Sequence, residues 1–499
     1  MDHGPDLHRR RGSVGLRLIR SFVALVLLAG AAAAQPTGDA ADAVFLASGV
    51  RVGEVGATSA VVWTRTTAEP QRRSGAEISG RPVVTLAPGV DVSSLEGAVP
   101  GVAGEVRVVL RPAAPAGEAG GIPARRIAGW RPTGAARDFT HQAAFDGLTP
   151  NTRYLVTVEA RPAALDPDAP ATAIETATFR TAPASDERSP VRFAAMTCQY
   201  YGRRDRPDGF RIYPSMAAGP PDFYLSIGDN VYYDNESPRA TSVELARYHW
   251  QRMFTLPAIA SFLRSVPGYW LKDDHDLLRN DSWPGIEPGI SAPMTFEEGQ
   301  AVFVEQMPAP ERPYRTVRWG KGLQLWLVEG RDFRSPNDMP DGPLKTIWGT
   351  EQWRWLRDSL LASDADWKVL VSPTPIVGPD RSNKADNHAN AAFSHEGDAV
   401  RGWFRANLGD SFLVIVGDRH WQYHSVHPET GLDEFSVGPA SDAHAGGTPG
   451  DDPEYHRFHR VGGGFLSVDV DWVDERPRIV LRHRDVSGRV VYEVERLGS

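Results

Sequence analysis

From residue 191 onward, short apolar runs alternate with segments whose apolar residues recur at helical spacing. The runs are VRFAAMTC (191–198), FYLSIGD (223–229), GYWLKDDHD (268–276), LQLWLVEGRD (323–332), WKVLVSP (367–373) and SFLVIVGDRH (411–420). The helical segments are 242–254, 295–307, 350–363 and 398–408. Buried strands that alternate with amphipathic helices are typical of layered α/β domains, so we expect such a domain over residues 190–499.

Residues 44–183 have strand signals instead. TSAVVWTR (58–65) is a candidate strand, and the turn at 148–151 is followed by alternation that starts at Tyr154. The LTPxTxY pattern resembles immunoglobulin- and fibronectin III-like sandwiches, in which the tyrosine anchors a corner; an unrelated hairpin is the alternative. We therefore expect an N-terminal β-sandwich domain at 44–183, a linker at 182–190, and a long loop insertion in the Gly-, Pro- and Ala-rich stretch 75–135.

The first 34 residues have the composition of an export signal. The basic segment HRRRGSVGLRLIR precedes the apolar run SFVALVLLAGAAAA, and small residues near Ala34 offer a cleavage site. A buried helix is the alternative, and the export route, general secretory or twin-arginine, stays open. No other stretch approaches transmembrane length, so we expect no membrane anchor in the mature chain and a periplasmic or extracellular location.

The charge of the chain disfavours one class of partner. The net charge is −9, from 63 acidic and 54 basic side chains, and removal of the basic N-terminal segment makes it more negative. An acidic protein gains nothing from attraction to a phosphate backbone, so we expect no nucleic-acid partner.

Four of the apolar runs end in side chains that commonly bind metals. The first ends at Cys198, the only cysteine; the others are followed by Asp229 and Tyr232, by Asp273, Asp274, His275, Asp276 and Asn280, and by Asp418 and His420. Each signal alone is weak, because Gly-Asp turns and acidic clusters are common. Binding residues in α/β folds gather at strand ends, however, so the joint pattern predicts one metal centre.

The donor types indicate a hydrolytic centre. Hydrolysis of a phosphate ester needs a hydroxide nucleophile and positive charge near the phosphate oxygens, and two metal ions about 3.5–4 Å apart supply both. Asp229 is the predicted bridging ligand. Thiolate, phenolate and imidazole favour a trivalent or soft transition metal, whereas Asp274 and Asp418 suit Ca²⁺, Mn²⁺ or Mg²⁺. For Cys198, a buried apolar role and a nucleophilic role are the alternatives to metal binding.

In order, these motifs resemble those of the PhoD-type alkaline phosphatases, relatives of purple acid phosphatases among the calcineurin-like metallophosphoesterases. The resemblance rests on the cysteine after the first strand, the GDxxY element at 228–232, a DDHE-type motif at 273–276 and the GDxH motif at 417–420. With the N-terminal sandwich it covers nearly the whole mature chain. It implies a four-layer α/β/β/α metallophosphatase domain after the sandwich.

The resemblance also implies a role for each motif residue. Cys198, Asp229, Tyr232 and His420 would hold Fe³⁺; Asp229, Asp274 and Asp418 would hold divalent ions, typically Ca²⁺, with Mn²⁺, Mg²⁺ or Zn²⁺ as alternatives; Asn280 would bind metal or phosphate. His275 would serve as an acid or electrostatic stabiliser near the leaving group.

Two further residues are candidate phosphate contacts. Asn230 follows the bridging aspartate, and Arg331 follows another strand, where a salt bridge is the alternative. The chain departs from the family pattern at Asp276, where the motif has glutamate, and at Lys272, where it has tryptophan. Adjacency to His275 favours Asp274 over Asp273 as the ligand.

The function implied is an exported phosphatase in which a metal-bound hydroxide attacks phosphorus in line. The substrate would be a phosphorylated small molecule or a phosphodiester. A phosphodiesterase of the phospholipase D type is the first alternative, and it would add peripheral contact with lipid. A non-catalytic carbohydrate- or surface-binding protein is the second, suggested by the sandwich and the 14 tryptophans. That second alternative leaves the strand-end residues unexplained.

Overall fold

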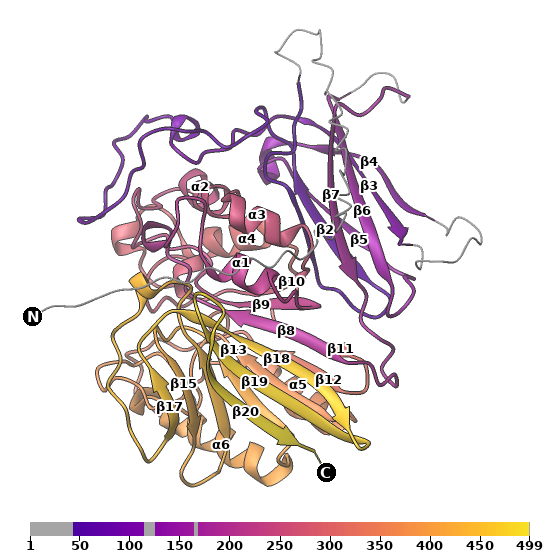
Figure 1. The fold of residues 1–499 in the computed structure, drawn as a ribbon. Helices are drawn as coiled ribbons and strands as arrows, with labels where there is room; N and C mark the ends of the chain where they lie inside the picture. The colour runs from indigo at the N-terminus through magenta and orange to yellow at the C-terminus, as the bar shows by residue number, and fades with distance from the viewer. Residues whose placement is uncertain (1–42, 114–124, 164–167, 499) are drawn as a thin grey trace, which may run out of the picture. The chain divides into compact units, whose positions relative to one another are not determined.

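Two large β-sheets and the helices that cover them organise the fold (Figure 1). The computed structural model describes residues 43–113, 125–163 and 168–498, which belong to one compact unit. The predicted export signal, residues 1–34, lies outside these ranges. The mixed α/β class predicted from the sequence is confirmed, and none of the described helices combines the length and apolar character that crossing a membrane requires.

The first sheet has nine strands in the order β20-β19-β18-β8-β9-β10-β1-β2-β5. Its centre is parallel: β8 (Val191–Met196), β9 (Phe223–Ile227) and β10 (Gly268–Leu271). On one side lie the antiparallel strands β18 (Gly464–Val473), β19 (Arg476–Asp485) and β20 (Val490–Leu497). On the other side lie β1 (Val50–Gly53), β2 (Ala60–Arg65) and β5 (Thr140–Phe145). Because Gly53 pairs with Gly268, this sheet includes strands from both predicted domains.

The second sheet has seven strands in the order β11-β12-β13-β14-β16-β15-β17. Strands β12 (Leu323–Leu327), β13 (Trp367–Ser372), β14 (Phe412–Val416) and β16 (Asp433–Val437) are parallel. Strands β11 (Arg315–Trp319), β15 (Gln422–Val426) and β17 (His456–Arg460) complete it in antiparallel pairings. Every apolar run predicted to be a strand in this half of the chain contains one.

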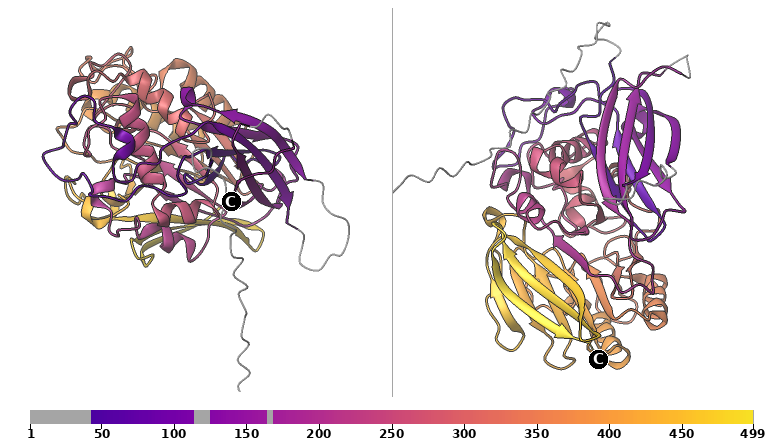
Figure 2. Two further views of the ribbon diagram at one scale, coloured as in Figure 1. Left: turned by 90° about the horizontal axis from the view of Figure 1, so that it is seen from above. Right: turned by 45° about the vertical axis from the view of Figure 1, so that its right-hand side comes forward.

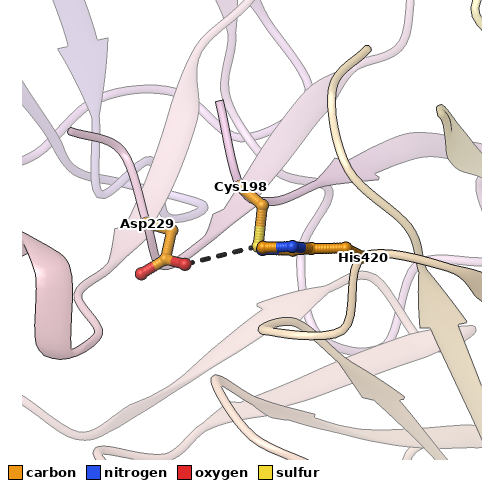
Figure 3. A group of neighbouring side chains, drawn as sticks. All are labelled: Cys198, Asp229 and His420. Atoms are coloured by element: carbon orange, nitrogen blue, oxygen red, sulfur yellow. Dashed lines mark hydrogen bonds between the residues drawn. The ribbon is translucent and has the colours of Figure 1, made fainter. Parts of the chain in front are cut away.

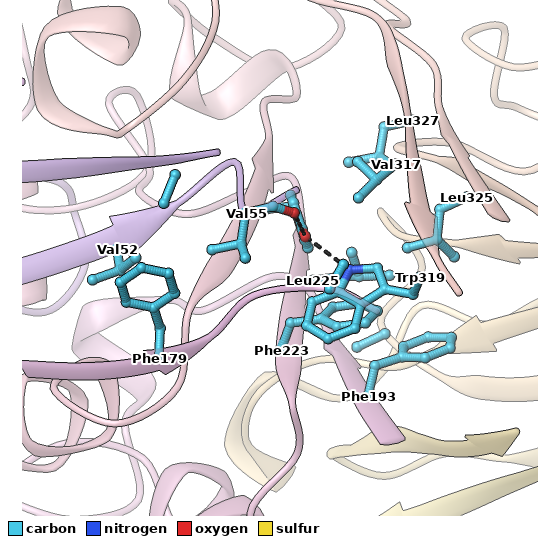
Figure 4. Packing of buried hydrophobic residues seen from close by; sticks show 14 of the residues in the cluster. Val52, Val55, Phe179, Phe193, Phe223, Leu225, Val317, Trp319, Leu325 and Leu327 are labelled. Carbon is cyan, nitrogen blue, oxygen red and sulfur yellow. Dashed lines mark hydrogen bonds between the residues drawn. The ribbon is translucent and has the colours of Figure 1, made fainter. Parts of the chain in front are cut away.

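The two large sheets share a hydrophobic core (Figure 4). Phe193, Phe223 and Leu225 of the first sheet face Trp319 and Leu325 of the second. The rings of Phe223 and Trp319 are 4.6 Å apart between centroids. The two sheets therefore pack face to face through these side chains.

Helices pack on the outer faces of both sheets. Apolar side chains of α1 (Ile212–Ala217), α2 (Val243–Phe254), α3 (Pro257–Leu263) and α4 (Phe296–Gln306) share a core with Met196, Tyr224 and Trp270 of the first sheet. Those of α5 (Gly349–Ala362) and α6 (Ser394–Asn407) share another with Trp326, Leu370 and Val414 of the second. The four predicted helical segments match α2, α4, α5 and α6.

A third sheet, in the order β4-β3-β6-β7, packs its side chains into the same core as β1, β2 and β5. Its strands are β3 (Gly104–Pro112), β4 (Arg126–Thr133), β6 (Arg153–Arg161) and β7 (Ala173–Arg180). The backbone N–H of Thr149 donates to Oη of Tyr154 at 2.9 Å, which fixes the predicted corner.

The prediction of a loop over 75–135 is wrong for part of this stretch. It contains β3 and β4, because Val106, Val108 and Leu110 alternate into the core and are fully buried. The Gly-, Pro- and Ala-rich composition hid this period-2 pattern. Residues 66–103 contain no β-strand within the described part of the chain and one short 3-10 helix at Val92–Ser94.

Candidate metal centre

The ends of three strands carry residues with left-handed backbone. Cys198 after β8 has φ 54°, Asp229 after β9 has φ 53°, and Asp418 after β14 has φ 60°. Residues other than glycine rarely adopt this conformation, and it persists where surrounding structure enforces it, often at functional sites. The three residues were selected from the sequence as metal ligands, and they share this strained turn.

Close contacts between the sheets bring these strand ends together. Gly417 precedes Asp418, and a Cβ at this position would lie 2.2 Å from the carbonyl oxygen of Ile227. Thr197 Oγ1 donates to the same carbonyl at 3.0 Å, and Thr197 forms an isolated bridge with Pro439, which follows β16 of the second sheet. Only glycine therefore permits this approach, which places donors from both sheets around one point.

One group of donors combines sulfur, oxygen and nitrogen (Figure 3). Single ligand atoms of Cys198, Asp229 and His420 lie within 4.8 Å of one another. Cys198 Sγ is 3.4 Å from Asp229 Oδ2, and Oη of Tyr232 donates to that oxygen at 2.9 Å. The structure thus brings together the four residues that the resemblance assigns to the ferric ion.

A second group combines Asp229, Asp274 and His275, again with ligand atoms within 4.8 Å. Asp229 belongs to both groups. The backbone N–H of Asp281 donates to the Asp274 carboxylate. Burial alone would raise the pKa of Asp274, but the charges of Arg331 and His275 outweigh burial and lower this pKa to about 2. Asp274 is therefore ionised and available to a cation.

The electrostatics of these groups favour a bound cation. Burial raises the pKa of Cys198 well above its usual value, and the charges of Asp229 and Asp418 raise it further. Burial also raises the pKa of Asp229 well above its usual value, and the charge of Asp274 adds to this effect although the charge of His275 opposes it. Burial and the charge of Asp229 likewise raise the pKa of Tyr232. Asp229 Oδ1 is buried and has no hydrogen-bond partner among the described residues. A metal ion would satisfy this oxygen and offset the repulsion, so the donor set fits one.

Asp229 and Tyr232 open onto a pocket of about 250 Å³, whereas Cys198 and Asp274 are buried and are not part of its lining. It is lined by Asp229, Tyr232, His275, Asn280, Asp418 and His420 among the predicted site residues, and also by Arg81, Tyr200, Arg203, Asn235, Arg381, Lys384 and His444. A larger cavity of about 590 Å³ lies near α4 and includes Lys272, Glu329 and Asp332, but none of the candidate ligands. The chemistry therefore belongs to the smaller pocket.

His275 is positioned by Asp234, which sequence reasoning missed. The Nδ1 atom of His275 lies 2.6 Å from Asp234 Oδ1, and the backbone N–H of Asn280 donates to the other oxygen at 3.0 Å. Burial lowers the pKa of His275, but the charges of Asp234, Asp274 and Asp229 outweigh it and raise the pKa well above its usual value. The signal was present, because Asp234 ends the run GDNVYYD that begins with the GDxxY element.

His444 is a second residue that the sequence did not single out as part of the centre. The centroid of its ring is 4.0 Å from the ring centroid of His420 and 5.4 Å from that of Tyr232. Its Nδ1 atom lies 3.1 Å from the carbonyl oxygen of Cys198. No motif surrounds His444, so only the fold reveals its place.

Two predicted phosphate contacts lie outside the pocket lining. The amide of Asn230 is buried and bonds to Ser226, to the carbonyl oxygen of Leu271 and to Asp276. Arg331 is buried too, in contact with Asp273 and 3.7 Å from Asp274. Both side chains are therefore buried among the residues that follow the strands. Asn230 bonds to Asp276, and Arg331 pairs with Asp273.

Donors of this kind at the strand ends of a mixed α/β fold fit a metal-dependent hydrolase. A family model described as PhoD-like phosphatase matches residues 193–460, more than half of the chain. The protein belongs to the PhoD-like phosphatase family and is thus a metal-dependent phosphoesterase. No curated protein matches the sequence.

Solved structures agree on the fold. A structure of PhoD is similar with a TM-score of 0.67 and 16% identity, over 93% of this chain and 90% of that one. The purple acid phosphatase PPD1 from yellow lupin (Lupinus luteus) seeds is similar with a TM-score of 0.59 and 13% identity, over 91% of this chain and 74% of that one. At these identities the likeness establishes the fold alone.

Proposed function

We propose that this protein is an exported phosphoester hydrolase that uses Fe³⁺ together with divalent ions, typically Ca²⁺. Fe³⁺ would be held by Cys198, Asp229, Tyr232 and His420, and the divalent ions by Asp229, Asp274, Asp418 and Asn280. Residues 44–183 would form an immunoglobulin-like sandwich, supported by the packing of the sheet β4-β3-β6-β7 on β1, β2 and β5. Residues 190–499 would form a four-layer catalytic domain, supported by the helices packed on the two large sheets. Export is proposed from the composition of residues 1–34.

The observation that carries the proposal is the position of Asp229. Its carboxylate takes part in both donor groups, and its Oδ1 is buried without a partner among the described residues. A carboxylate between two donor sets is the arrangement that a two-metal hydrolase needs. This supports a bridging role for Asp229.

When bound, two ions would supply positive charge to phosphate oxygens and lower the pKa of a water molecule. The side chains around them orient and protonate the substrate. Burial opposes protonation of His275, but the charge of Asp234 raises its pKa, and Asp234 engages Nδ1. His275 would then act through Nε2 as the proton donor to the leaving-group oxygen and not as a metal ligand. Tyr232, whose ring centroid is 4.5 Å from that of His275, restricts the movement of the imidazole.

The test is the metal content and visible spectrum of protein purified without chelator. Fe³⁺ bound by the Tyr232 phenolate and the Cys198 thiolate should give a coloured charge-transfer band, with about one iron and some calcium per chain. The band should shift or disappear in Tyr232→Phe and Cys198→Ser and stay unchanged in Tyr455→Phe, a control outside the pocket. Colourless protein that binds only zinc or magnesium would contradict the role of Cys198. Hydrolysis of p-nitrophenyl phosphate and of bis(p-nitrophenyl) phosphate then separates monoesterase from diesterase activity.

A further inference from the structure

The segment between β2 and β3, residues 66–103, reaches the metal-centre pocket. Figure 1 shows this indigo segment extending from the N-terminal strands past α2, and Figure 2 shows the same segment from two other sides. The N–H of Val84 donates to Ser237 Oγ at 2.9 Å, and the N–H of Arg239 donates to the carbonyl oxygen of Val84 at 2.8 Å. Glu77 forms an ion pair with Arg204. These contacts hold the segment beside the pocket and place Arg81 in its lining.

Basic side chains outnumber carboxylates in the lining of the metal-centre pocket. Four cationic side chains line it, Arg81, Arg203, Arg381 and Lys384, against two carboxylates, Asp229 and Asp418, both proposed as metal ligands. Over the whole chain, acidic side chains outnumber basic ones by 63 to 54. The pocket therefore carries more basic than acidic side chains, the reverse of the chain as a whole.

Two of these cations already have carboxylate partners. Lys384 Nζ lies 2.7 Å from Asp281 and 3.1 Å from Asp386, and Arg381 Nε lies 3.6 Å from Asp380. Their charges are therefore largely balanced by the protein itself.

Arg81 and Arg203 differ from them. Within the described residues, neither forms an ion pair, and Arg81 makes no hydrogen bond. Arg203 donates to the carbonyl oxygen of Ala443 at 3.1 Å, and its guanidinium lies 5.7 Å from the centroid of the Tyr200 ring. Most of the hydrogen-bonding capacity of both guanidinium groups is thus free at the rim of the pocket.

A single phosphate at the metal ions does not need these two arginines, because the ions themselves would neutralise its charge. A guanidinium group is suited to planar, bidentate bonding of a carboxylate or phosphate. Positive side chains at a pocket rim also concentrate anionic ligands. The two arginines therefore fit a second anionic group on the same substrate.

We propose that the substrates are phosphoesters that carry a second anionic group, a phosphate or a carboxylate, which Arg81 and Arg203 bind while the first phosphate lies at the metal centre. This inference rests on the proposed function and specifies its substrate class. It assigns selectivity to the 66–103 segment and to the loop after β8, and the chemical step to the strand ends.

The kinetic test uses the full metal-loaded chain and three substrates on one carbon skeleton. Glycerol 3-phosphate has no second anion, 3-phosphoglycerate adds a carboxylate, and 2,3-bisphosphoglycerate adds a further phosphate. We expect kcat/KM to be roughly tenfold or more higher for the two substrates with an added anion. The ratio of kcat/KM between the substrates with and without an added anion should fall toward one in the double variant Arg81→Gln/Arg203→Gln. Arg188→Gln, the same change at an arginine far from the pocket, should retain it.

A binding measurement tests the same inference without turnover. Isothermal titration calorimetry with inorganic pyrophosphate and with orthophosphate should show pyrophosphate bound about tenfold more tightly, with the difference reduced in the double variant. Equal kcat/KM for all three substrates, or a pyrophosphate preference that survives in the double variant, would overturn the inference. Absence of any hydrolysis would contradict the proposed function, and the calorimetric comparison would still decide the role of the arginines.

Discussion

Cys198 Sγ lies 3.4 Å from Asp229 Oδ2, although the two residues are 31 positions apart in the chain. They follow the neighbouring parallel strands β8 and β9, and each turns away from its strand through a left-handed backbone conformation. Parallel pairing therefore brings the thiol and the carboxylate to one edge of the sheet. The contact ties the chemistry of the centre to the register of the two strands.

Adjacent aspartates after β10 should respond differently to the same substitution. Asp273→Asn leaves the buried Arg331 without its main partner and should lower the free energy of unfolding by about 3–5 kcal/mol. Asp274→Asn should instead remove a divalent ion and lower kcat by roughly 100-fold or more, the scale of a lost electrostatic stabiliser. Urea denaturation and metal analysis of both variants check this. Equal metal loss with equal stability loss would contradict the distinct roles.

Gly417 should not tolerate a side chain. In Gly417→Ala the Cβ would lie 2.2 Å from the carbonyl oxygen of Ile227 and 2.8 Å from Thr197 Oγ1, so the two sheets would have to separate locally. We expect a loss of about 1–3 kcal/mol in the free energy of unfolding, together with reduced metal content. Gly409→Ala, where no atom lies within 4 Å of the new Cβ, is the matched control. Thermal unfolding and iron content are the measurements.

Stability should decrease in acid partly because of His483 in β19. Burial lowers the pKa of His483 to about 3, and Nε2 lies 2.9 Å from the carbonyl oxygen of Ser436. Between the usual histidine pKa of about 6.5 and the lowered pKa of the folded state, His483 is protonated in the unfolded chain but neutral in the folded chain. The folded state therefore loses about 1.4 kcal/mol per pH unit from this group as the pH falls from 6.5 toward 3.

The variant His483→Gln isolates this contribution. Urea denaturation between pH 7 and pH 4 should give a shallower pH dependence for His483→Gln than for the natural chain. His395→Gln, at an exposed position of α6, should keep the original slope. Parallel slopes for all three proteins would show that His483 does not contribute.

The corner at Tyr154 should stabilise the N-terminal strands without affecting the metal centre. Tyr154→Phe removes the acceptor of the Thr149 N–H and should lower the free energy of unfolding by about 1–2 kcal/mol. Metal content should not change. The matched control is Tyr455→Phe, because the Tyr455 hydroxyl makes no hydrogen bond within the described residues. Differential scanning calorimetry of both variants is the measurement.

Local sequence patterns predicted the parts of this protein that depend on neighbouring residues. The apolar runs and helical segments after residue 191 correspond to strands and helices, since period and hydrophobicity are encoded within each segment. The candidate ligands Cys198, Asp229 and Asp418 stood out for the same reason, because each comes shortly after its own strand. The pattern 104–112 was missed because its valines stand within a stretch rich in loop-forming residues.

Contacts between distant segments account for the rest. Nothing near Arg81 or His444 in the sequence indicates a pocket, because their neighbours in space come from other parts of the chain. Arg331 and Asn230 follow strands as the ligands do, but their side chains are buried against Asp273 and Asp276. Sequence position alone does not reveal which way a side chain turns at the end of a strand.

The course of residues 66–103 has a consequence for how enzymes of this architecture diversify. The residues proposed to hold metal follow buried strands, where substitutions are constrained by packing, whereas Arg81 lies on a surface segment from another part of the chain. Substitutions at the exposed positions of that segment, unlike those at its buried Val92 and Ala98, would leave the packing beneath the reactive centre unchanged. Changes within about forty residues of surface chain could therefore alter which phosphoesters are bound while the residues proposed to hold metal stay the same.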